Sequence, residues 1–439
     1  MLKIFKNLLS KKFSNAPETT SEIIPMSSLN LSPSDISKDA LQVIDILHDN
    51  NYEAFIVGGA IRDLILNQTP KDFDIATNAP PEEIKKIFRR AGKHAQIIGK
   101  RFPIVHVYTG RQTLEVSTFR SQSNYVNHEG RIIQDNQYGS IHDDANRRDF
   151  TCNALYLDPI NQNIHSYHNA LQHLENKKLI MIGEIETRLK EDPIRIIRAA
   201  RIAVKTNLTI ETSLLENMQK NAYLLPNEPG SRLFDEWVKI IYSKHAYQCI
   251  LLLKKLKILP FIHPITKVIF EYHSDNDKSL VKNTLQQTDY RLQNNQSISL
   301  GFVISALLWP IVEKKWQYNQ SQGMKPPQAL HEAILSVMNE DHIISDIPNK
   351  NIASMNEIWL MQNRLETAKS RQQIQKLLNH PRFRAAYDFF VLRTKSNNIN
   401  ENKVQWWTKI IENQTKPPTN QQNKNRNRKP SKTGNNQTL

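Results

Sequence analysis

Two aspartates in the run DFDIAT, residues 72–77, could hold a metal ion. Asp72 and Asp74 are two residues apart, and on a β-strand such residues point to the same face. Two carboxylates on one face repel each other unless a cation lies between them. Mg²⁺ prefers oxygen ligands, usually one or two carboxylates beside substrate phosphates. An isolated pair of this kind is usually a solvated strand face, so a metal site needs a second signal nearby.

A phosphate-binding signal comes directly before the two aspartates. The apolar run 54–57 ends in Gly58 and Gly59 and leads into a predicted helix, whose first N–H groups can approach an anion without obstruction by a side chain. Arg62 follows in that helix and could donate to the same anion. The segment is not a P-loop, because it lacks the G-x-x-x-x-G-K-[ST] pattern. The combination predicts phosphoryl-transfer chemistry.

Two further groups of charged residues could complete such a site. Glu115, in LEVSTF, lies on a predicted neighbouring strand and could be a third carboxylate for a pair of metal ions. Arg147 and Arg148 stand beside Asp149 in NRRDFTCNAL, and paired arginines suit triphosphate or ribose recognition. Taken alone, Glu115 is a surface strand acid and the RRD run is a surface ion-pair cluster, so both alternatives stay open.

The run EDPIRIIRAARIA, residues 191–203, predicts a helix with one basic face. Asp192 is a candidate N-cap and Pro193 a candidate first helical residue. Arg195 and Arg198 are three residues apart and share a face, while the apolar residues form a core side. By itself, this pattern is typical of an ordinary capped amphipathic helix.

The elements that must position these residues fall into two groups. Residues 50–160 predict a small α/β unit, and from Glu186 onward nearly every segment has helical periodicity. The predicted elements are helices at 37–49, 60–67 and 80–90, strands at 54–57, 72–76, 95–99, 104–110 and 113–119, helices at 191–205, 231–243 and 245–256, and a helical block at 280–395. The predicted fold class is therefore α+β, a small α/β head followed by mainly helical domains.

Composition favours a polyanionic partner. The 439 residues include 58 Lys and Arg against 43 Asp and Glu, and the net charge of +15 suits nucleic acid or an anionic membrane surface. Two cysteines, Cys152 and Cys249, exclude a disulfide framework and suit a reducing, cytoplasmic location. No apolar run approaches the roughly 18 residues of a membrane-spanning helix. The tail from Lys416 is either an electrostatic tether for nucleic acid or an idle segment.

Together, these motifs resemble the class II branch of the nucleotidyltransferase superfamily, which holds tRNA CCA-adding enzymes and bacterial poly(A) polymerases. GGAIRD with DFDIAT is similar to the first catalytic motif, DDANRRDFTCNAL to the second, and EDPIRIIRAAR to the nucleotide-selecting motif. The stretches that resemble the bacterial poly(A) polymerases more than the CCA-adding enzymes are GKRFPIVHV (99–107), GSIHDDANRRDFT (139–151), PGSRLFDEW (229–237), HPRFRAAYDFFVLR (380–393) and VQWW (404–407).

The resemblance implies roles for these residues. Asp72, Asp74 and Glu115 match the ligands of two Mg²⁺ ions, and Asp149 matches a further catalytic acid that touches either metal or nucleotide. The residues that match nucleotide contacts are Gly58, Gly59, Arg62, Arg148, Asp192, Arg195 and Arg198. The expected domains are a flexible arm at 1–36, a catalytic head at 37–185, a nucleotide-selecting helical neck at 186–260, an RNA-binding helical body at 261–410 and a basic disordered tail at 411–439.

The base-selecting role has a simple hydrogen-bond logic. Adenine offers an amino donor and a ring acceptor, which suit the Asp192 carboxylate and the Arg195 guanidinium. Guanine has the opposite polarity and would leave mismatched polar groups, which discriminates strongly. Cytosine has the same polarity as adenine, so this pair does not choose between them.

The expected activity is template-independent transfer of AMP from ATP to single-stranded RNA 3′ ends, which promotes RNA decay. The alternative is a CCA- or A-adding enzyme that acts on tRNA. A basic RNA-binding protein on an inactive transferase scaffold is disfavoured, because Asp72, Asp74 and Glu115 are all present. The expected protein is a monomer with RNA-decay partners and no stable membrane span.

Overall fold

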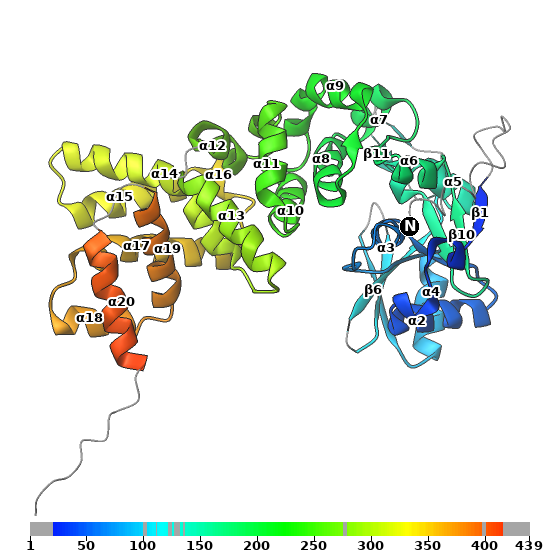
Figure 1. The fold of residues 1–439 in the computed structure, drawn as a ribbon, viewed down its shortest axis with the longest axis horizontal. Helices are drawn as coiled ribbons and strands as arrows, with labels where there is room; N and C mark the ends of the chain where they lie inside the picture. Colours follow the sequence, from blue (N-terminus) through cyan, green and yellow to red (C-terminus); the bar gives the residue numbers. More distant parts are fainter. Residues whose placement is uncertain are drawn as a thin grey trace, which may run out of the picture.

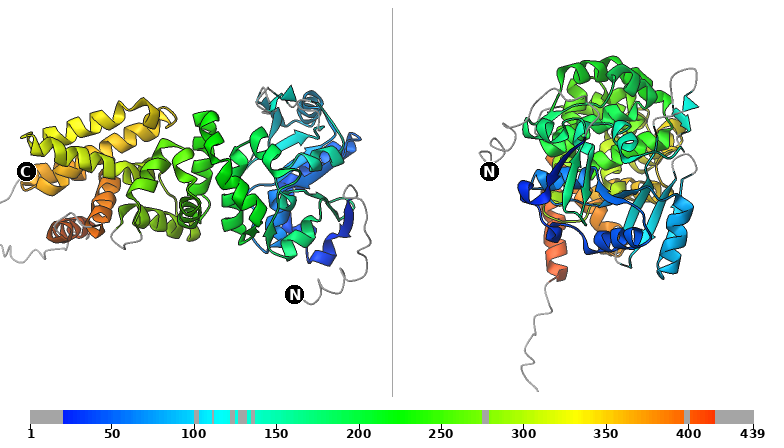
Figure 2. Two further views of the ribbon diagram at one scale, coloured as in Figure 1. Left: turned by 90° about the horizontal axis from the view of Figure 1, so that it is seen from above. Right: turned by 90° about the vertical axis from the view of Figure 1, so that its right-hand side faces the viewer.

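The computed structural model describes residues 21–99, 103–110, 112–121, 125–126, 132–134, 137–274, 279–396 and 401–415. These residues form an arch, with an α/β head at one end, a helical neck at the crown and a helical body at the other end (Figure 1). Seen from above, the head and the body lie at opposite ends of an elongated molecule (Figure 2). The predicted fold class is confirmed, while the domain boundaries stay predictions. Residues 411–415, predicted to begin the disordered tail, are helical. Residues 416–439 of the tail, residues 1–20 of the arm and residues 100–102 of the GKRFPIVHV stretch lie outside the described residues.

The head is built on an eight-stranded sheet in the order β1-β10-β9-β2-β3-β6-β5-β4, in which β3 and β6 pair in parallel. Its strands are β1 (Glu22–Pro25), β2 (Ala54–Val57), β3 (Asp74–Thr77), β4 (His94–Ile98), β5 (Ile104–Tyr108), β6 (Thr113–Thr118), β9 (Leu155–Asp158) and β10 (Asn163–Ser166). Short strands outside it are β7 (Tyr125–Val126), β8 (Ile132–Gln134), β11 (Lys178–Leu179) and β12 (Thr209–Ile210).

Helices cover both faces of this sheet. The head helices are α2 (Lys38–Asp49), α3 (Gly59–Ile65), α4 (Pro81–Arg90), α5 (Ile141–Asn146) and α6 (Ala170–Glu175). Apolar residues of α2 and α4 share one core with Ile56, Ile75 and Val116, whereas Ala145 of α5 packs on the opposite face against Val57. The alternation of strand side chains therefore separates the main core from the face that carries Asp74.

Strand β3 begins later than predicted. Its first residue, Asp74, pairs with Val57, the last residue of β2, and β2 then turns away at Gly58. Asp72 therefore precedes the strand, and the prediction of one strand over 72–76 is wrong at its start. The pairing of Ile75 with Val116 places Asp74 and Glu115 at matching positions of the parallel β3–β6 pair.

The segment 21–36 also differs from the prediction of a loose arm. Strand β1 pairs antiparallel with β10 over four residues and forms one edge of the sheet. Met26 and Ile36 are buried in the head core, so this part of the chain gains apolar burial that its Ser- and Pro-rich composition does not suggest.

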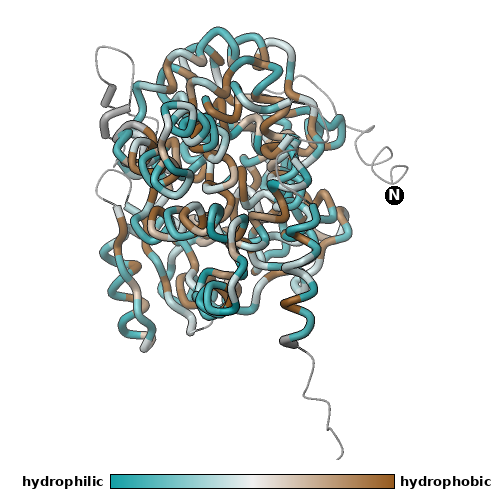
Figure 3. The backbone as a smooth tube through the Cα atoms, turned by 90° about the vertical axis from the view of Figure 1, so that its left-hand side faces the viewer, coloured by the Kyte–Doolittle hydropathy of each residue, from teal (hydrophilic) through white to brown (hydrophobic). Residues whose placement is uncertain are grey.

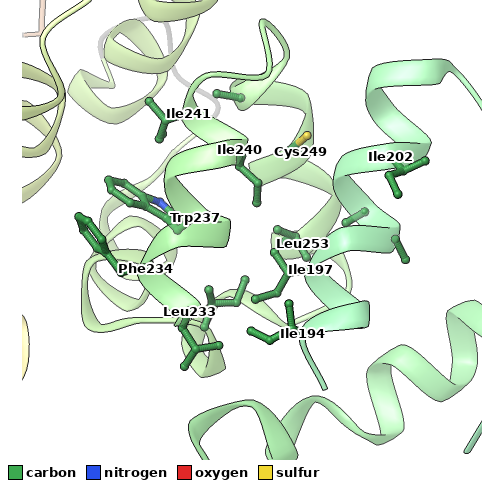
Figure 4. Close-up of a cluster of buried hydrophobic side chains, with 14 of the residues drawn as sticks. Ile194, Ile197, Ile202, Leu233, Phe234, Trp237, Ile240, Ile241, Cys249 and Leu253 are labelled. Carbon is green, nitrogen blue, oxygen red and sulfur yellow. The ribbon is translucent and has the colours of Figure 1, made fainter. Parts of the chain in front are cut away.

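The neck helices are α7 (Ile185–Glu191), α8 (Ile194–Thr206), α9 (Thr212–Lys220), α10 (Gly230–Ile241) and α11 (Ala246–Lys255). Side chains of α8, α10 and α11 point toward one another in a shared core that includes Ile197, Ile240 and Leu253 (Figure 4). Helix α8 begins at Ile194 with Pro193 as its N-cap, three residues after the start of the predicted range 191–205 and one residue after the predicted N-cap and first helical residue would place it. Its apolar side lies in this core, so its basic side faces the head.

The body helices are α12 (Pro264–Tyr272), α13 (Leu280–Gln293), α14 (Leu300–Ser321), α15 (Pro326–Met338), α16 (Asp341–Ile344), α17 (Asn349–Thr367), α18 (Arg371–Leu378), α19 (Phe383–Lys395) and α20 (Glu401–Thr415). Apolar segments gather in the interior and polar segments lie outside (Figure 3). Of the helices within the described ranges, none is long and apolar enough to cross a membrane.

Neck and body meet closely at one glycine. A Cβ atom on Gly230, the first residue of α10, would collide with the carboxylate of Asp346, so no side chain fits there. The imidazole of His263 is buried beside the same carboxylate, with 3.6 Å between its Nε2 atom and Asp346 Oδ2. This contact helps to set the position of the body relative to α10.

Candidate active site

A cleft of about 1400 Å³ lies between the head and the neck and reaches the end of α13 in the body. Its lining contains every predicted site residue except Glu115, namely Gly58, Gly59, Arg62, Asp72, Asp74, Arg148, Asp149, Asp192, Arg195 and Arg198. These residues come from three motifs that are far apart in sequence. The structure therefore brings the predicted constellation together in one place.

The acidic edge of the cleft, which we define as Asp72, Asp74 and Glu115, lacks strong cationic partners. The surrounding protein, followed by repulsion from Glu115, raises the pKa of Asp74 to about 6. Asp72 has a side chain that is 71% exposed, and its one ionic partner within the described ranges is Lys71, at 3.6 Å. Glu115 lies 3.7 Å from the imidazole of His106. Three neighbouring acids therefore carry an excess of negative charge.

The donor set of the acidic edge fits a hard divalent cation such as Mg²⁺. Carboxylate oxygens are its preferred protein ligands, and a cation would relieve the repulsion that raises the pKa of Asp74. Among the described residues, however, no three His, Cys, Asp or Glu side chains are already grouped closely enough to hold an ion. Asp72, in the exposed segment before β3, would have to turn toward Asp74. The metal assignment stays a prediction.

The glycine turn has the shape that its sequence predicts. Gly58 has φ +70°, a conformation that favours glycine, and a Cβ atom there would lie 2.9 Å from Arg148 Nη1. Arg62, in α3, is buried, and its guanidinium donates to Asp63 at 2.6 Å and to Asn153 at 2.7 Å. These partners hold the guanidinium in place where Arg62 lines the cleft.

Arg148 is held at the end of α5 by three groups. Its guanidinium donates to Asp144 at 3.0 Å, to the Tyr156 hydroxyl at 2.7 Å and to the backbone carbonyl of Asn153 at 3.3 Å. The side chain still lines the cleft beside Gly58. This fixed cation is well placed for a phosphate at the glycine turn.

Asp149 joins the head to the neck. Arg198 of α8 donates to its Oδ2 atom through Nε at 2.7 Å and Nη2 at 2.6 Å, and Asn153 donates to Oδ1 at 2.8 Å. Burial alone would raise the pKa of Asp149, but Arg198 and Asn153 hold it well below its usual range. With its oxygens occupied, Asp149 has the geometry of a positioning residue, and its predicted catalytic role stays untested.

The two predicted base-selecting residues also have partners. Arg232 of α10 donates to Asp192 Oδ2 at 2.9 Å. Arg195 donates to Glu191 at 3.1 Å and to the backbone carbonyl of Arg188 at 2.6 Å. These contacts fix the carboxylate and the guanidinium at the mouth of α8, where both line the cleft.

Sequence reasoning missed the residues that hold this arrangement. Arg188 donates to Glu191 and to the backbone carbonyls of Arg147 and Arg148 at 2.6 Å each, so it ties α7 to the end of α5. Glu236 of α10 is buried among arginine and lysine side chains. Their partners on other elements lie 35 to 41 residues away, so no local pattern identifies these contacts. The available signal for Glu236 was its position inside the run PGSRLFDEW, whereas Arg188 lies outside the runs singled out above.

Three family models match the chain. The poly A polymerase head domain matches residues 54–180, the probable RNA and SrmB-binding site of polymerase A matches residues 207–270, and the polymerase A arginine-rich C-terminus matches residues 322–438. Poly(A) polymerase I of Salmonella typhimurium is 33% identical over 425 residues, which cover 92% of this chain and 90% of that protein. The Haemophilus influenzae poly(A) polymerase I is 32% identical, with 91% and 90% covered.

Relatives that add nucleotides to tRNA are similar over less of the sequence or in fold alone. The CCA-adding enzyme of Streptococcus pyogenes is 36% identical over 213 residues, which cover 48% of this chain and 51% of that enzyme. A solved tRNA nucleotidyltransferase complexed with a primer tRNA and an ATP analogue has a TM-score of 0.56 at 20% identity, covering 85% of this chain and 99% of that one. The family predicted from the motifs is confirmed.

Proposed function

The chain belongs to the bacterial poly(A) polymerase family of nucleotidyltransferases, and from this premise we propose that it adds AMP from ATP to single-stranded RNA 3′ ends without a template. The observation that carries the proposal is the cleft itself. One wall offers Asp72, Asp74 and the Gly58 turn, and the opposite wall offers Asp192 and Arg195. A nucleotide between them would have its phosphates at the head and its base at the neck.

The proposed reaction transfers an adenylyl group in a single displacement. The RNA 3′-oxygen forms a bond to the α-phosphorus of ATP, the bond to pyrophosphate breaks, and the hydroxyl proton passes to solvent. Mg²⁺ held by Asp72, Asp74 and Glu115 would lower the pKa of the 3′-hydroxyl and offset phosphate charge. Arg148, fixed by Asp144 and Tyr156, would stabilise the departing pyrophosphate.

The neck would hold the adenine. Asp192 would accept from the amino group and Arg195 would donate to the ring nitrogen. Arg232 and Glu191 already orient these two side chains, so binding needs little rearrangement of the cleft wall. The ion pair of Asp149 with Arg198 joins the head to the neck, so it would hold the adenine-binding residues at a fixed distance from the phosphate-binding residues.

A tRNA nucleotidyltransferase is the second candidate, because the same fold occurs in solved tRNA-adding enzymes and because Asp192 and Arg195 suit cytosine as well as adenine. One experiment separates the two. The protein is incubated with an unstructured RNA, and separately with tRNA lacking its 3′ end, with each nucleoside triphosphate alone and with CTP and ATP together. Long tails formed from ATP alone on the unstructured RNA support the proposal. One to three nucleotides added only to tRNA, with use of CTP, would contradict it.

A further inference from the structure

The basic face of α8 is a stripe of four cations that lines the cleft. Most of them have a short ionic partner, since Arg195 meets Glu191 at 3.1 Å, Arg198 meets Asp149 at 2.6 Å and Lys205 meets Asp63 at 2.7 Å. The exception is Arg201. Among the described residues, its five donor positions make one hydrogen bond, from Nη2 to Glu236 at 3.4 Å.

Arg201 is largely buried, yet its guanidinium makes few hydrogen bonds with the described residues. Its side chain is 19% exposed, and its buried Nε atom has no acceptor in the described part of the chain. Burial lowers its pKa below the usual value, and repulsion from Arg198 and Arg62 adds to this, although Glu236 opposes it. A guanidinium in this state gains strongly from an added anion.

Glu236 cannot neutralise its surroundings. Its carboxylate lies 2.7 Å from Lys239, 3.4 Å from Arg201 and 3.9 Å from Arg198. Although burial acts to raise its pKa, these cations hold the pKa of Glu236 below its usual value. One carboxylate thus faces three cations, of which Arg198 is already paired with Asp149, and the wall keeps a positive excess at Arg201 and Lys239.

The same wall continues away from the glycine turn toward the body. Lys244 is exposed, has φ +68° and has no carboxylate partner among the described residues. Its backbone carbonyl accepts from Gln293 at the end of α13, so the neck and the body meet here. Tyr242 is 42% exposed, and all of these residues line the cleft.

We propose that Arg201, Lys239 and Lys244 form a subsite for RNA phosphodiesters directly behind the 3′ end, with Tyr242 as a stacking surface for one base. This inference rests on the proposed function and names the part of the cleft that would hold the acceptor strand. Phosphate oxygens match the donors of these cations, and an aromatic ring between them suits an unpaired base. The triphosphate of ATP is expected at the Gly58 turn of the head, whereas this subsite lies on α8 and α10 and extends to α13.

The test measures binding of a short single-stranded oligoadenylate without ATP, across a series of salt concentrations. Arg201→Gln and Lys239→Gln should each raise the Kd about tenfold, and each should reduce the slope of log K against log salt by about 0.7. Arg201→Lys should recover most of the affinity, since it keeps the charge. Tyr242→Ala should weaken binding more than Tyr242→Phe, because the ring supplies the stacking.

Lys255→Gln is the matched control. Lys255 is an exposed lysine near the end of α11 that does not line the cleft, so its loss should leave both the Kd and the salt slope unchanged. If Arg201→Gln fails to fold, Lys239→Gln and Lys244→Gln decide the question, because both side chains lie at the surface. An effect of Lys255→Gln equal to theirs would overturn the subsite.

A separate measurement of ATP binding without RNA distinguishes the two sources of phosphate. Unchanged ATP affinity with weakened oligoadenylate binding supports the proposal. Weakened ATP affinity with unchanged RNA binding would assign these cations to the nucleotide and overturn it, as would no change in either. Because these assays need no catalysis, a protein that binds RNA here but adds no AMP would contradict the proposed function and leave the subsite standing.

Discussion

The acidic edge of the head and the joint between head and neck hold their carboxylates in opposite electrostatic states. At the edge, Asp74 has a raised pKa and its nearest carboxylates repel it. At the joint, Asp149 and Glu236 have lowered pKa values, because arginines surround them. All of these acids lie within or beside one cleft. The pKa of Asp74 differs in direction from those of Asp149 and Glu236 because fewer cations lie near it, and not because of its position along the cleft.

This difference distinguishes two uses of an acid. A carboxylate whose oxygens already accept from arginine is held in place and holds its neighbours, as Asp149 does with Arg198. A carboxylate that lacks a cation is the one expected to bind a cation. We therefore propose that Asp74 belongs to the metal site and that Asp149 acts as a positioning residue.

The largest expected effect is at Asp74. Asp74→Asn should lower the rate of AMP addition at least about a thousandfold, because it removes a charge from the metal-binding edge. Thermal unfolding should begin no lower than for the parent protein, since the repulsion from Glu115 is lost. Nucleotide addition and the Tm are measured at saturating Mg²⁺. Activity within tenfold of the parent would remove Asp74 from the metal site.

Acidification tests the comparison at His263, a buried imidazole that its surroundings keep uncharged. Burial lowers the pKa of His263 to about 4, although Asp346 opposes the shift. The unfolded chain takes up this proton near pH 6.5, so stability is lost as the pH falls from about 6.5 to 4, by up to about 3 kcal/mol. Urea unfolding across this range measures the loss.

His263→Gln is the control for this loss. It should flatten that part of the pH profile, because its amide does not titrate, whereas His331→Gln, a substitution at an exposed site, should not. If the free energy of unfolding falls equally steeply with pH in the parent and in His263→Gln, other titrating groups cause the loss of stability in acid.

A smaller effect is expected at the joint. Asp149→Asn and Arg198→Gln should each destabilise the fold, and the double variant should lose less than the sum, with a coupling of about 2 kcal/mol. The cycle is measured by urea unfolding. A coupling near zero would mean that Asp149 is not held by Arg198 and would return it to the candidates for metal or nucleotide contact.

The smallest effect is expected at the thiols. Burial raises the pKa of Cys152 and of Cys249 to about 12, so neither is a nucleophile although Cys152 adjoins the cleft residue Asn153. Iodoacetamide should leave the native activity unchanged and label both residues only in urea. Rapid labelling of Cys152 with loss of activity would show that the cleft opens to it.

Motif spacing predicted which side chains meet, but not how they are held. Gly58, Asp74, Arg148 and Arg195 line one cleft as expected, because each motif begins or ends at a strand or helix terminus that the topology brings there. Asp72 was misplaced, because the i, i+2 rule applies only where the strand has a partner, and β2 ends opposite Asp74.

The supporting ion pairs could not be predicted from local pattern. Arg232 reaches Asp192 across 40 residues, and Arg188 bonds to carbonyls about as far away. Such pairs depend on how α7, α8 and α10 pack, which helical periodicity does not specify. Arg201 continues the three-residue spacing of Arg195 and Arg198. That its guanidinium makes a single long hydrogen bond among the described residues is visible only in three dimensions.

The pairing of β1 with β10 has a practical consequence for anyone who trims this protein. A chain cut to the matched head region, residues 54–180, would lose Glu22–Pro25 and leave the backbone donors and acceptors of β10 open. Exposed strand edges recruit other chains. Self-association of such a fragment would therefore say nothing about the oligomeric state of the whole protein, and a soluble head should begin ahead of Glu22.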